Sequence, residues 1–264
     1  MNFVGHIIGY MFRLIAYRNI VISENLRNSF PKKSTKQISQ LRKAYYRYFG
    51  RLIAESFKLF DISKQEIKQR ITFINDQLIK THLENEKEVI VVLGHYGNWE
   101  WALLASNLHF ETEMVGIYKP LSNAFWNDKL LSIRSQFGAK LINMKESPRY
   151  LLKKRNKSRL IGIVADQTPA FEEINHSITF LNQKTAVFLG TEKLAKKLQC
   201  PVFFAYVSPQ KFGQYTIRFD LISEFPNKYK KGELTMLHSK KLEKQIKTNP
   251  TYWLWSHRRW KHLR

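Results

Sequence analysis

The 264-residue sequence lacks the residue types and motifs on which several large protein classes depend. It has one cysteine, Cys200, so no disulfide can form within the chain, and this usage is compatible with a reducing compartment. Cys200 precedes an apolar run, which predicts a buried, inert thiol rather than a nucleophile. Neither zinc-type Cys/His spacing, nor a Gly-x-Ser-x-Gly elbow, nor a phosphate-binding Gly-Lys-Ser/Thr loop occurs. The sequence therefore gives no support to a zinc site, an elbow-type serine hydrolase or a P-loop enzyme.

Acidic residues are scarce, with 21 Asp and Glu against 44 Lys and Arg, and the formal net charge is +23. Such a charge indicates anionic partners: nucleic acid, an anionic membrane leaflet, or an acidic protein or phosphorylated substrate. The basic residues are spread along the chain and no RNA- or DNA-binding motif is present, so we expect no nucleic-acid partner. No linker rich in Pro, Gly or Ser divides the chain, which favours one domain.

No apolar run reaches the length of about 20 residues that spans a bilayer. The longest candidate, residues 3–17, contains His6 and Arg13 and lacks the cleavage site of a signal peptide. Two interpretations stay open: an ordinary core helix, or a helix in the membrane interface with Arg13 and Arg18 extended toward headgroups.

From residue 72 onward, short apolar runs alternate with segments of helical periodicity. This alternation predicts a single α/β domain with a largely parallel central sheet flanked by helices. Upstream, residues 20–60 are helical in pattern with a break at Phe30-Pro31, and Ser34 or Thr35 can cap the second helix. The expected strands are residues 72–74, 88–93, 114–118, 139–142, 160–165, 202–207 and 215–221, and the expected helices are residues 99–108, 127–137, 190–198 and 234–247.

A histidine follows the most apolar of these strands, in the sequence Val-Val-Leu-Gly-His-Tyr-Gly-Asn-Trp-Glu of residues 91–100. The carboxyl end of a buried strand is where α/β folds place their chemistry. If a helix begins next, Glu100 can hold one imidazole nitrogen of His95, and the other nitrogen is then free to accept a proton. Gly94 and Gly97 keep side chains away from both flanks of His95. The alternative is a hydrogen-bonded structural histidine beside a solvated glutamate.

Polar residues also follow two further predicted strands: Tyr118 and Lys119 follow one, and Asp166 and Gln167 follow another. Because the carboxyl ends of parallel strands share one edge of a sheet, we expect these residues to meet the histidine in one crevice. Arg134, one helix beyond Lys119, can add a second cation. Two cations beside a His/Glu pair suit an anionic substrate, such as one that bears phosphate. Taken singly, Lys119 fits a solvated loop and Asp166 a turn.

Six segments, in order along the chain, resemble those of the lipid A biosynthesis (lauroyl/myristoyl) acyltransferase family, within the lysophospholipid acyltransferase superfamily. His95 and Glu100 resemble its catalytic motif of His, four residues and an acid. The other segments resemble an N-terminal signature, two internal blocks, a late helix–strand unit and a C-terminal signature. They are residues 18–31, residues 118–120 with Arg134 and residues 137–138, residues 165–167, residues 190–202 and residues 250–261.

The resemblance implies transfer of a fatty acyl chain from an acyl thioester, on acyl carrier protein or coenzyme A, to a hydroxyl of a lipid acceptor. A lipid A precursor is the family's usual acceptor. His95 would deprotonate the hydroxyl and Glu100 would orient His95. The hydroxyl attacks the thioester directly, so neither a Ser or Cys nucleophile nor a cofactor besides the thioester co-substrate is expected. The residues that the resemblance assigns to substrate binding are Tyr118, Lys119, Arg134, Asp166 and Gln167.

The resemblance also implies a bacterial protein at the cytoplasmic face of the inner (plasma) membrane. Residues 1–30 would be a membrane-associating segment and residues 31–264 the acyltransferase domain, with a fold like that of glycerolipid acyltransferases. The net charge of +23 suits an anionic leaflet, an anionic acceptor and an acidic carrier protein. Arg258 and Arg259 would contact an anionic headgroup or else cap and decorate a terminal helix.

Three other functions stay open at this point. The chain could be a lipid-binding relative without activity, or an acyltransferase for another acceptor, such as an ornithine- or glycine-containing lipid. A metallohydrolase that uses His95 and Glu100 is the third, but no further ligand stands at helix or strand spacing from them.

Overall fold

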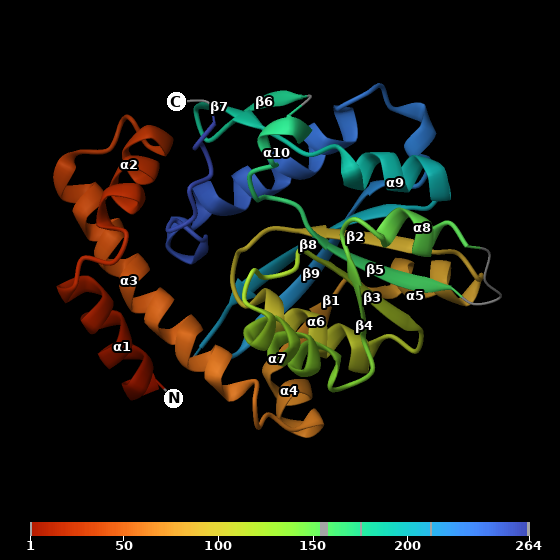
Figure 1. Ribbon diagram of the computed structural model, residues 1–264, viewed down its shortest axis with the longest axis horizontal. Coiled ribbons are helices and arrows are strands. Elements are labelled where there is room, and N and C mark those ends of the chain that lie inside the picture. Colours follow the sequence, from red (N-terminus) through yellow and green to blue (C-terminus); the bar gives the residue numbers. More distant parts are fainter. Residues whose placement is uncertain (1, 154–157, 175, 212, 263–264) are drawn as a thin grey trace.

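The computed structural model describes residues 2–153, 158–174, 176–211 and 213–262. Its described part contains a seven-stranded sheet of order β1-β9-β8-β2-β5-β3-β4 and a separate hairpin of β6 and β7 (Figure 1). The five strands from β8 to β4 are parallel, whereas β9 is antiparallel to β8 and parallel to β1. The strands are β1 (Ile71–Ile74), β2 (Val89–Leu93), β3 (Glu113–Tyr118), β4 (Lys140–Asn143), β5 (Arg159–Val164), β6 (Ser177–Phe180), β7 (Gln183–Ala186), β8 (Val202–Pro209) and β9 (Tyr215–Ser223).

Helices cover both faces of the sheet, and three N-terminal helices stand beside it, in red and orange in Figure 1. Three short 3₁₀ turns, at Phe171–Glu173, Pro226–Lys228 and Pro250–Tyr252, complete the regular elements of the described residues. The helices are α1 (Asn2–Leu14), α2 (Asn19–Ser29), α3 (Thr35–Lys58), α4 (Lys64–Arg70), α5 (Gln77–Glu84), α6 (Trp99–His109), α7 (Ala124–Ser135), α8 (Ser147–Leu151), α9 (Gly190–Leu198) and α10 (Glu233–Thr248).

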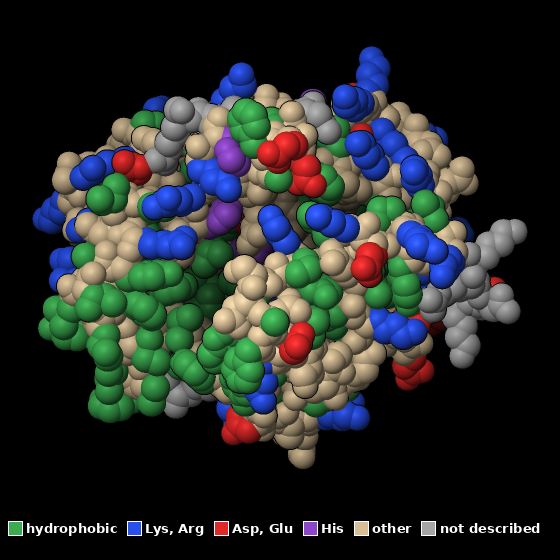
Figure 2. All heavy atoms as spheres, viewed as in Figure 1, with side chains coloured by type: hydrophobic (Ala, Val, Ile, Leu, Met, Phe, Trp, Pro, Cys, Tyr) green, Lys and Arg blue, Asp and Glu red, His purple; other side chains and the backbone are tan. Residues whose placement is uncertain are grey.

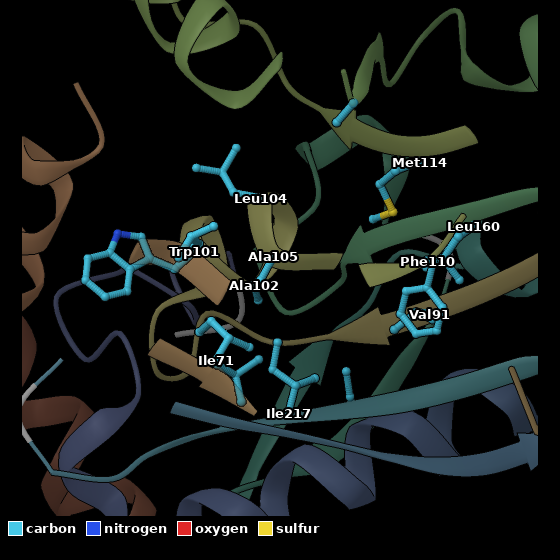
Figure 3. Packing of buried hydrophobic residues seen from close by; sticks show 14 of the residues in the cluster. Ile71, Val91, Trp101, Ala102, Leu104, Ala105, Phe110, Met114, Leu160 and Ile217 are labelled. Carbon is cyan, nitrogen blue, oxygen red and sulfur yellow. The ribbon is translucent and has the colours of Figure 1, made fainter. Parts of the chain in front are cut away.

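Strand β2 is buried on both sides, which explains why its sequence is apolar throughout rather than alternating. Successive residues of a strand point to opposite faces. Val89 and Val91 accordingly belong to a core cluster that includes Trp101, Ala102 and Ala105 of α6, and Figure 3 shows part of this cluster. Ile90 and Val92 pack on the other face, in a cluster that includes residues of α8 and α9.

The α/β fold with a largely parallel sheet, predicted from the sequence, is confirmed. Every predicted strand and helix from residue 72 onward is present, with ends that differ by up to a few residues. Ser34 caps α3 as predicted: its Oγ accepts the Gln37 backbone N–H, and the Gln37 side chain accepts the Ser34 N–H. Cys200 is buried, as expected, and burial raises the pKa of its thiol to about 12. The hairpin β6–β7 and the short helices α4, α5 and α8 were not predicted.

Helix α1 packs against α3 at a close crossing, because glycines face one another there. A Cβ on Gly50 would lie 2.2 Å from the backbone nitrogen of Gly9, so the two backbones touch. The outer face of α1 is apolar and exposed, with Phe3 77% accessible, so α1 is not a buried core helix. Within the described ranges, no helix combines the length and the apolar composition needed to cross a bilayer.

Helix α2 and the residue before it meet the C-terminal segment beside the sheet. The Arg18 side chain donates to the Ser256 carbonyl at 2.8 Å, and Asn25 Nδ2 donates to the carbonyls of Trp255 and His257, both at 2.9 Å. Tyr96 forms an antiparallel bridge with Trp253. Residues 249–260, which we call the C-terminal strap, are thereby fixed against the loop that follows β2.

Candidate active site

His95 and Asp166 form the centre of the candidate site. Strands β2 and β5 are direct neighbours, with Leu93 opposite Val164, so the residues that follow these two strands lie side by side. His95 Nδ1 is 2.5 Å from Asp166 Oδ1, and the His95 backbone N–H donates to Asp166 Oδ2 at 2.9 Å. The same carboxylate therefore fixes both the ring and the backbone of His95.

Two glycines let this loop close up, as the sequence suggested. A Cβ on Gly94 would lie 2.6 Å from Leu242 of α10 and 3.1 Å from Asp166 Oδ2. Gly97 has a φ of +65°, a conformation that side-chain-bearing residues rarely adopt, and a Cβ there would lie 2.6 Å from the Val207 carbonyl oxygen. Larger residues at either position would force the His95 loop away from the sheet.

Asp166 is ionised at its position despite deep burial. Burial raises its pKa, but the charge of His95 and the hydrogen bonds from His95 and from the Trp253 indole, at 2.7 Å, outweigh burial and hold the pKa well below its usual range. A carboxylate accepts hydrogen bonds and cannot donate them, so His95 Nδ1 carries the proton. In the neutral imidazole, the lone pair of His95 then lies on Nε2.

His95 Nε2 points to the accessible side of the loop, and the His95 side chain is 14% exposed. Gln167 is exposed, and its side-chain nitrogen is 3.2 Å from His95 Nε2. The Trp99 ring stands edge-on to the imidazole, with 4.8 Å between the ring centroids. A hydroxyl group that enters beside Trp99 can replace the Gln167 amide as the hydrogen-bond donor to Nε2.

The expectation that Glu100 holds the imidazole of His95 differs from the structure. Glu100 is the second residue of α6, and its carboxylate faces α7, where Arg134 Nε and Nη2 donate to it at 2.7 and 2.6 Å. The indole of Trp99 donates to Glu100 Oε1 at 3.1 Å. Burial lowers the pKa of Arg134, and the interaction with Glu100 more than offsets this and raises it. Among the described residues, the carboxylate partner of His95 Nδ1 is Asp166.

Tyr118 and Lys119 lie at the same edge of the sheet as His95, as predicted, because β3 is parallel to β5. Tyr118 is partly buried and Lys119 is exposed. The Tyr118 carbonyl accepts the Met144 N–H at 2.8 Å, which ties the end of β3 to the segment after β4. Within the described part of the chain, no hydrogen bond, ion pair or ring contact joins the side chain of Tyr118 or Lys119 to His95.

Sequence reasoning missed the role of the C-terminal strap at this site. Trp253 donates to Asp166, and the Thr168 hydroxyl donates to the Arg259 carbonyl at 2.7 Å. His257 Nε2 is 3.3 Å from the Thr168 backbone nitrogen, and burial lowers the pKa of His257 to about 4. Arg259, expected to contact a headgroup or to cap and decorate a terminal helix, is 3% exposed, whereas Arg258 is exposed. The tryptophan-rich composition of the strap was the available signal, but its partner could not be read from it.

Figure 2 shows a hollow in which histidine side chains are visible. Lys and Arg side chains gather along one side of it, and on the other side an apolar surface extends over the region of α1 and α3. The exposed apolar residues of these helices and the α1–α2 turn are Phe3, Val4, Ile7, Tyr10, Met11, Leu14, Ile15 and Phe57. Basic charge and apolar surface therefore border the same hollow. In the described ranges, no three His, Cys, Asp or Glu side chains gather into a group that could hold a metal ion.

Comparison with known proteins identifies the family. No curated protein matches the chain. The profile of the family described as bacterial lipid A biosynthesis acyltransferase matches residues 1–262, which is nearly the whole chain and includes both His95 and Asp166. The chain therefore belongs to the bacterial lipid A biosynthesis acyltransferase family.

Proposed function

We propose that this protein transfers a fatty acyl chain from an acyl thioester to a hydroxyl of a lipid A precursor, with His95 as general base and Asp166 as its orienting carboxylate. The observation that carries the proposal is the 2.5 Å contact between His95 Nδ1 and Asp166 Oδ1. It fixes the tautomer in which Nε2 is basic. Figure 2 shows histidine side chains in a hollow that cationic and apolar side chains border. Membership of a family of lipid A acyltransferases supports the reaction class.

The reaction follows from this arrangement. The acceptor hydroxyl donates a hydrogen bond to His95 Nε2, and the imidazole takes its proton as the oxygen attacks the thioester carbonyl. The imidazolium that forms is stabilised by Asp166, which is already ionised. When the tetrahedral intermediate collapses, the carbon–sulfur bond breaks and the leaving thiolate takes the proton from Nε2. An ester, a free thiol and neutral His95 result.

The other predicted site residues are assigned to binding. An arginine has five N–H donors, and Glu100 engages Arg134 through two nitrogens, so donors are left for an anionic group of a substrate. In this proposal Glu100 acts through Arg134 rather than through His95. Lys119 and Tyr118 lie at the same edge of the sheet as His95. The acceptor hydroxyl replaces the Gln167 amide as the hydrogen-bond donor to His95 Nε2.

We further propose that residues 1–30 hold the enzyme on the cytoplasmic face of the bacterial inner membrane, with residues 31–264 as the acyltransferase domain. The exposed apolar face of α1 supports an interfacial position. We expect the double variant Ile7→Gln/Met11→Gln to sediment with anionic phospholipid vesicles about tenfold less than wild type. Phe225→Gln, which changes an exposed aromatic residue outside the N-terminal segment, is the matched control. Equal sedimentation of the double variant and the control would contradict the proposal.

The test of the catalytic proposal is His95→Ala, assayed with an acyl thioester and a lipid A precursor and read out by mass spectrometry of the acceptor. A general base contributes about 10²–10⁴-fold, so a loss of at least about 100-fold is expected. His109→Ala is the control, because His109 lies at the opposite end of α6 and pairs with Asp76. Near-wild-type turnover in His95→Ala would contradict the proposal.

The same assay separates the alternatives. A wild-type protein that binds lipid without turnover would be an inactive relative, and acylation of an ornithine- or glycine-containing lipid in preference to a lipid A precursor would change the acceptor. Loss of turnover with EDTA and its rescue by a divalent cation would favour a metallohydrolase.

A further inference from the structure

A small cavity of about 10 Å³ borders Asp166. Its lining combines apolar side chains of the sheet and of α10 with three groups that can carry charge, namely Asp166, His238 and Arg259. This volume is about the size that one water molecule requires. The cavity is therefore a polar site of single-water size that the candidate catalytic carboxylate helps to line.

Two of these groups have unused hydrogen-bonding capacity. Arg259 Nε and Nη1 are buried and have no hydrogen-bond partner among the described residues, and the same holds for His238 Nε2. A buried arginine donor without an acceptor is costly, and native proteins satisfy nearly all such groups with protein or ordered water. The cost points to a bound group that accepts hydrogen bonds from Arg259.

We propose that the cavity binds one structural water, which links Arg259 to Asp166 and His238, and that Arg259 is a positioning residue for the His95–Asp166 pair. The proposal rests on the catalytic role proposed above for that pair. It adds a buried cation that acts on Asp166 without contact to a substrate.

The hydrogen bonds of such a water can be counted. It accepts from one donor of Arg259, either Nε–H or Nη1–H, and it donates to Asp166 and to His238 Nε2. Asp166 has room for this donor, because its two oxygens accept three hydrogen bonds, from His95 twice and from Trp253, and a carboxylate offers about four acceptor positions. His238 can accept, because burial lowers its pKa to about 4 and keeps it neutral. One water thus gives Arg259 an acceptor and gives Asp166 and His238 one donor each.

The electrostatic role of Arg259 follows from the groups around the pair. Burial lowers the pKa of Arg259 to about 10, with an opposing contribution from Asp166, so the guanidinium is charged at neutral pH. The other titratable groups near Asp166 are His238 of α10 and His257 of the strap, and both have pKa values lowered to about 4. Near neutral pH, Arg259 is therefore a fixed positive charge near the Asp166 carboxylate, while these two histidines are neutral.

A crystal structure of the wild-type protein tests the water directly. We expect an ordered water within about 3.2 Å of Arg259 Nε or Nη1 and of an Asp166 oxygen. A cavity without solvent density, or a direct contact between Arg259 and Asp166 that leaves no space for water, would overturn the proposal. This outcome does not depend on turnover, so it stands apart from the test of the proposed function.

Arg259→Met tests the positioning role. Removal of a nearby cation favours the protonated imidazole, so the pKa of His95, followed by NMR titration, should rise by about 0.5–1 unit. The acidic limb of kcat/KM should move to higher pH by the same amount. Arg259→Lys keeps the charge and should restore most of the wild-type pKa, and Arg258→Met is the control from an exposed neighbour. An Arg259→Met protein that folds with an unchanged His95 pKa would show a merely structural role and overturn the assignment.

Discussion

Two carboxylates follow neighbouring parallel strands at one edge of the sheet, and they have different hydrogen-bond partners. Asp166, after β5, is buried and accepts from His95 and from the Trp253 indole. Glu100, in the first turn of α6, accepts from Arg134 and from the Trp99 indole. Asp166 thus pairs with the titratable ring of His95, whereas Glu100 pairs with the permanent cation of Arg134. The comparison teaches that strand adjacency, rather than closeness in sequence, decides which acid reaches the histidine.

The largest expected difference is between Asp166→Asn and Glu100→Gln. Asparagine can donate to His95 Nδ1 and thereby favour the wrong tautomer, so we expect kcat to fall by about 10³-fold or more. Glu100→Gln keeps the His95–Asp166 pair and should cost far less. Steady-state kinetics of the two variants, side by side, check the ranking, and an equal or larger loss in Glu100→Gln would reverse the roles that we propose.

The comparison also has a consequence for stability against pH. The folded-state pKa of Asp166 is depressed, so its ionisation stabilises the fold above the unfolded pKa of about 4, and this contribution is lost as pH falls through the lower folded value. Urea unfolding of wild type and Asp166→Asn between pH 2 and 6 measures it. The difference in unfolding free energy should be largest near pH 6 and shrink below pH 4. A difference that does not change with pH would exclude this linkage.

A smaller effect is expected at the second carboxylate. Glu100→Gln and Arg134→Gln should each lower kcat/KM about 10-fold, because either change frees the other side chain. A double-mutant cycle should show coupling, with the double variant hardly worse than either single one. Additive losses would mean that the two side chains act on the substrate independently. His95 titration should be nearly unchanged in all three variants.

The smallest effect is expected for Trp253→Phe, which removes one donor to Asp166 and keeps most of the aromatic packing. A lost hydrogen bond to a charged group corresponds to about 1.5–3 kcal/mol, part of which Asp166 recovers from His95 and solvent. We therefore expect a loss in kcat of about 3–10-fold. Trp255→Phe is the control, because the Trp255 indole donates to the Pro250 carbonyl rather than to Asp166. A larger loss in the control would assign the effect to packing of the strap.

The sequence was sufficient to predict the strands of the seven-stranded sheet and their shared edge, because runs such as Val89–Leu93 are apolar at every position. It also predicted that Asp166 and Lys119 would lie at the edge that carries His95. It did not reveal that β2 pairs directly with β5, since strand order depends on long-range packing. Spacing therefore favoured Glu100 as the partner of His95, although the first turn of α6 directs its carboxylate toward Arg134.

The burial of Arg259 could not be predicted for a related reason. Arg258 and Arg259 are adjacent and chemically identical, and one is exposed while the other is buried. Which of them points inward depends on how the strap crosses the Asp166 loop, where the Thr168 hydroxyl bonds the Arg259 carbonyl. Neither periodicity nor composition encodes that crossing.

The contact of the strap with the start of the chain has a consequence for biosynthesis. Asn25 and Trp255 are separated by 230 positions, and Trp253 follows Asp166 by 87. On the ribosome, the apolar α1 is therefore exposed to the cell long before the strap leaves the exit tunnel. A nascent chain can therefore reach a lipid surface before Trp253 bonds Asp166 and Asn25 bonds the strap.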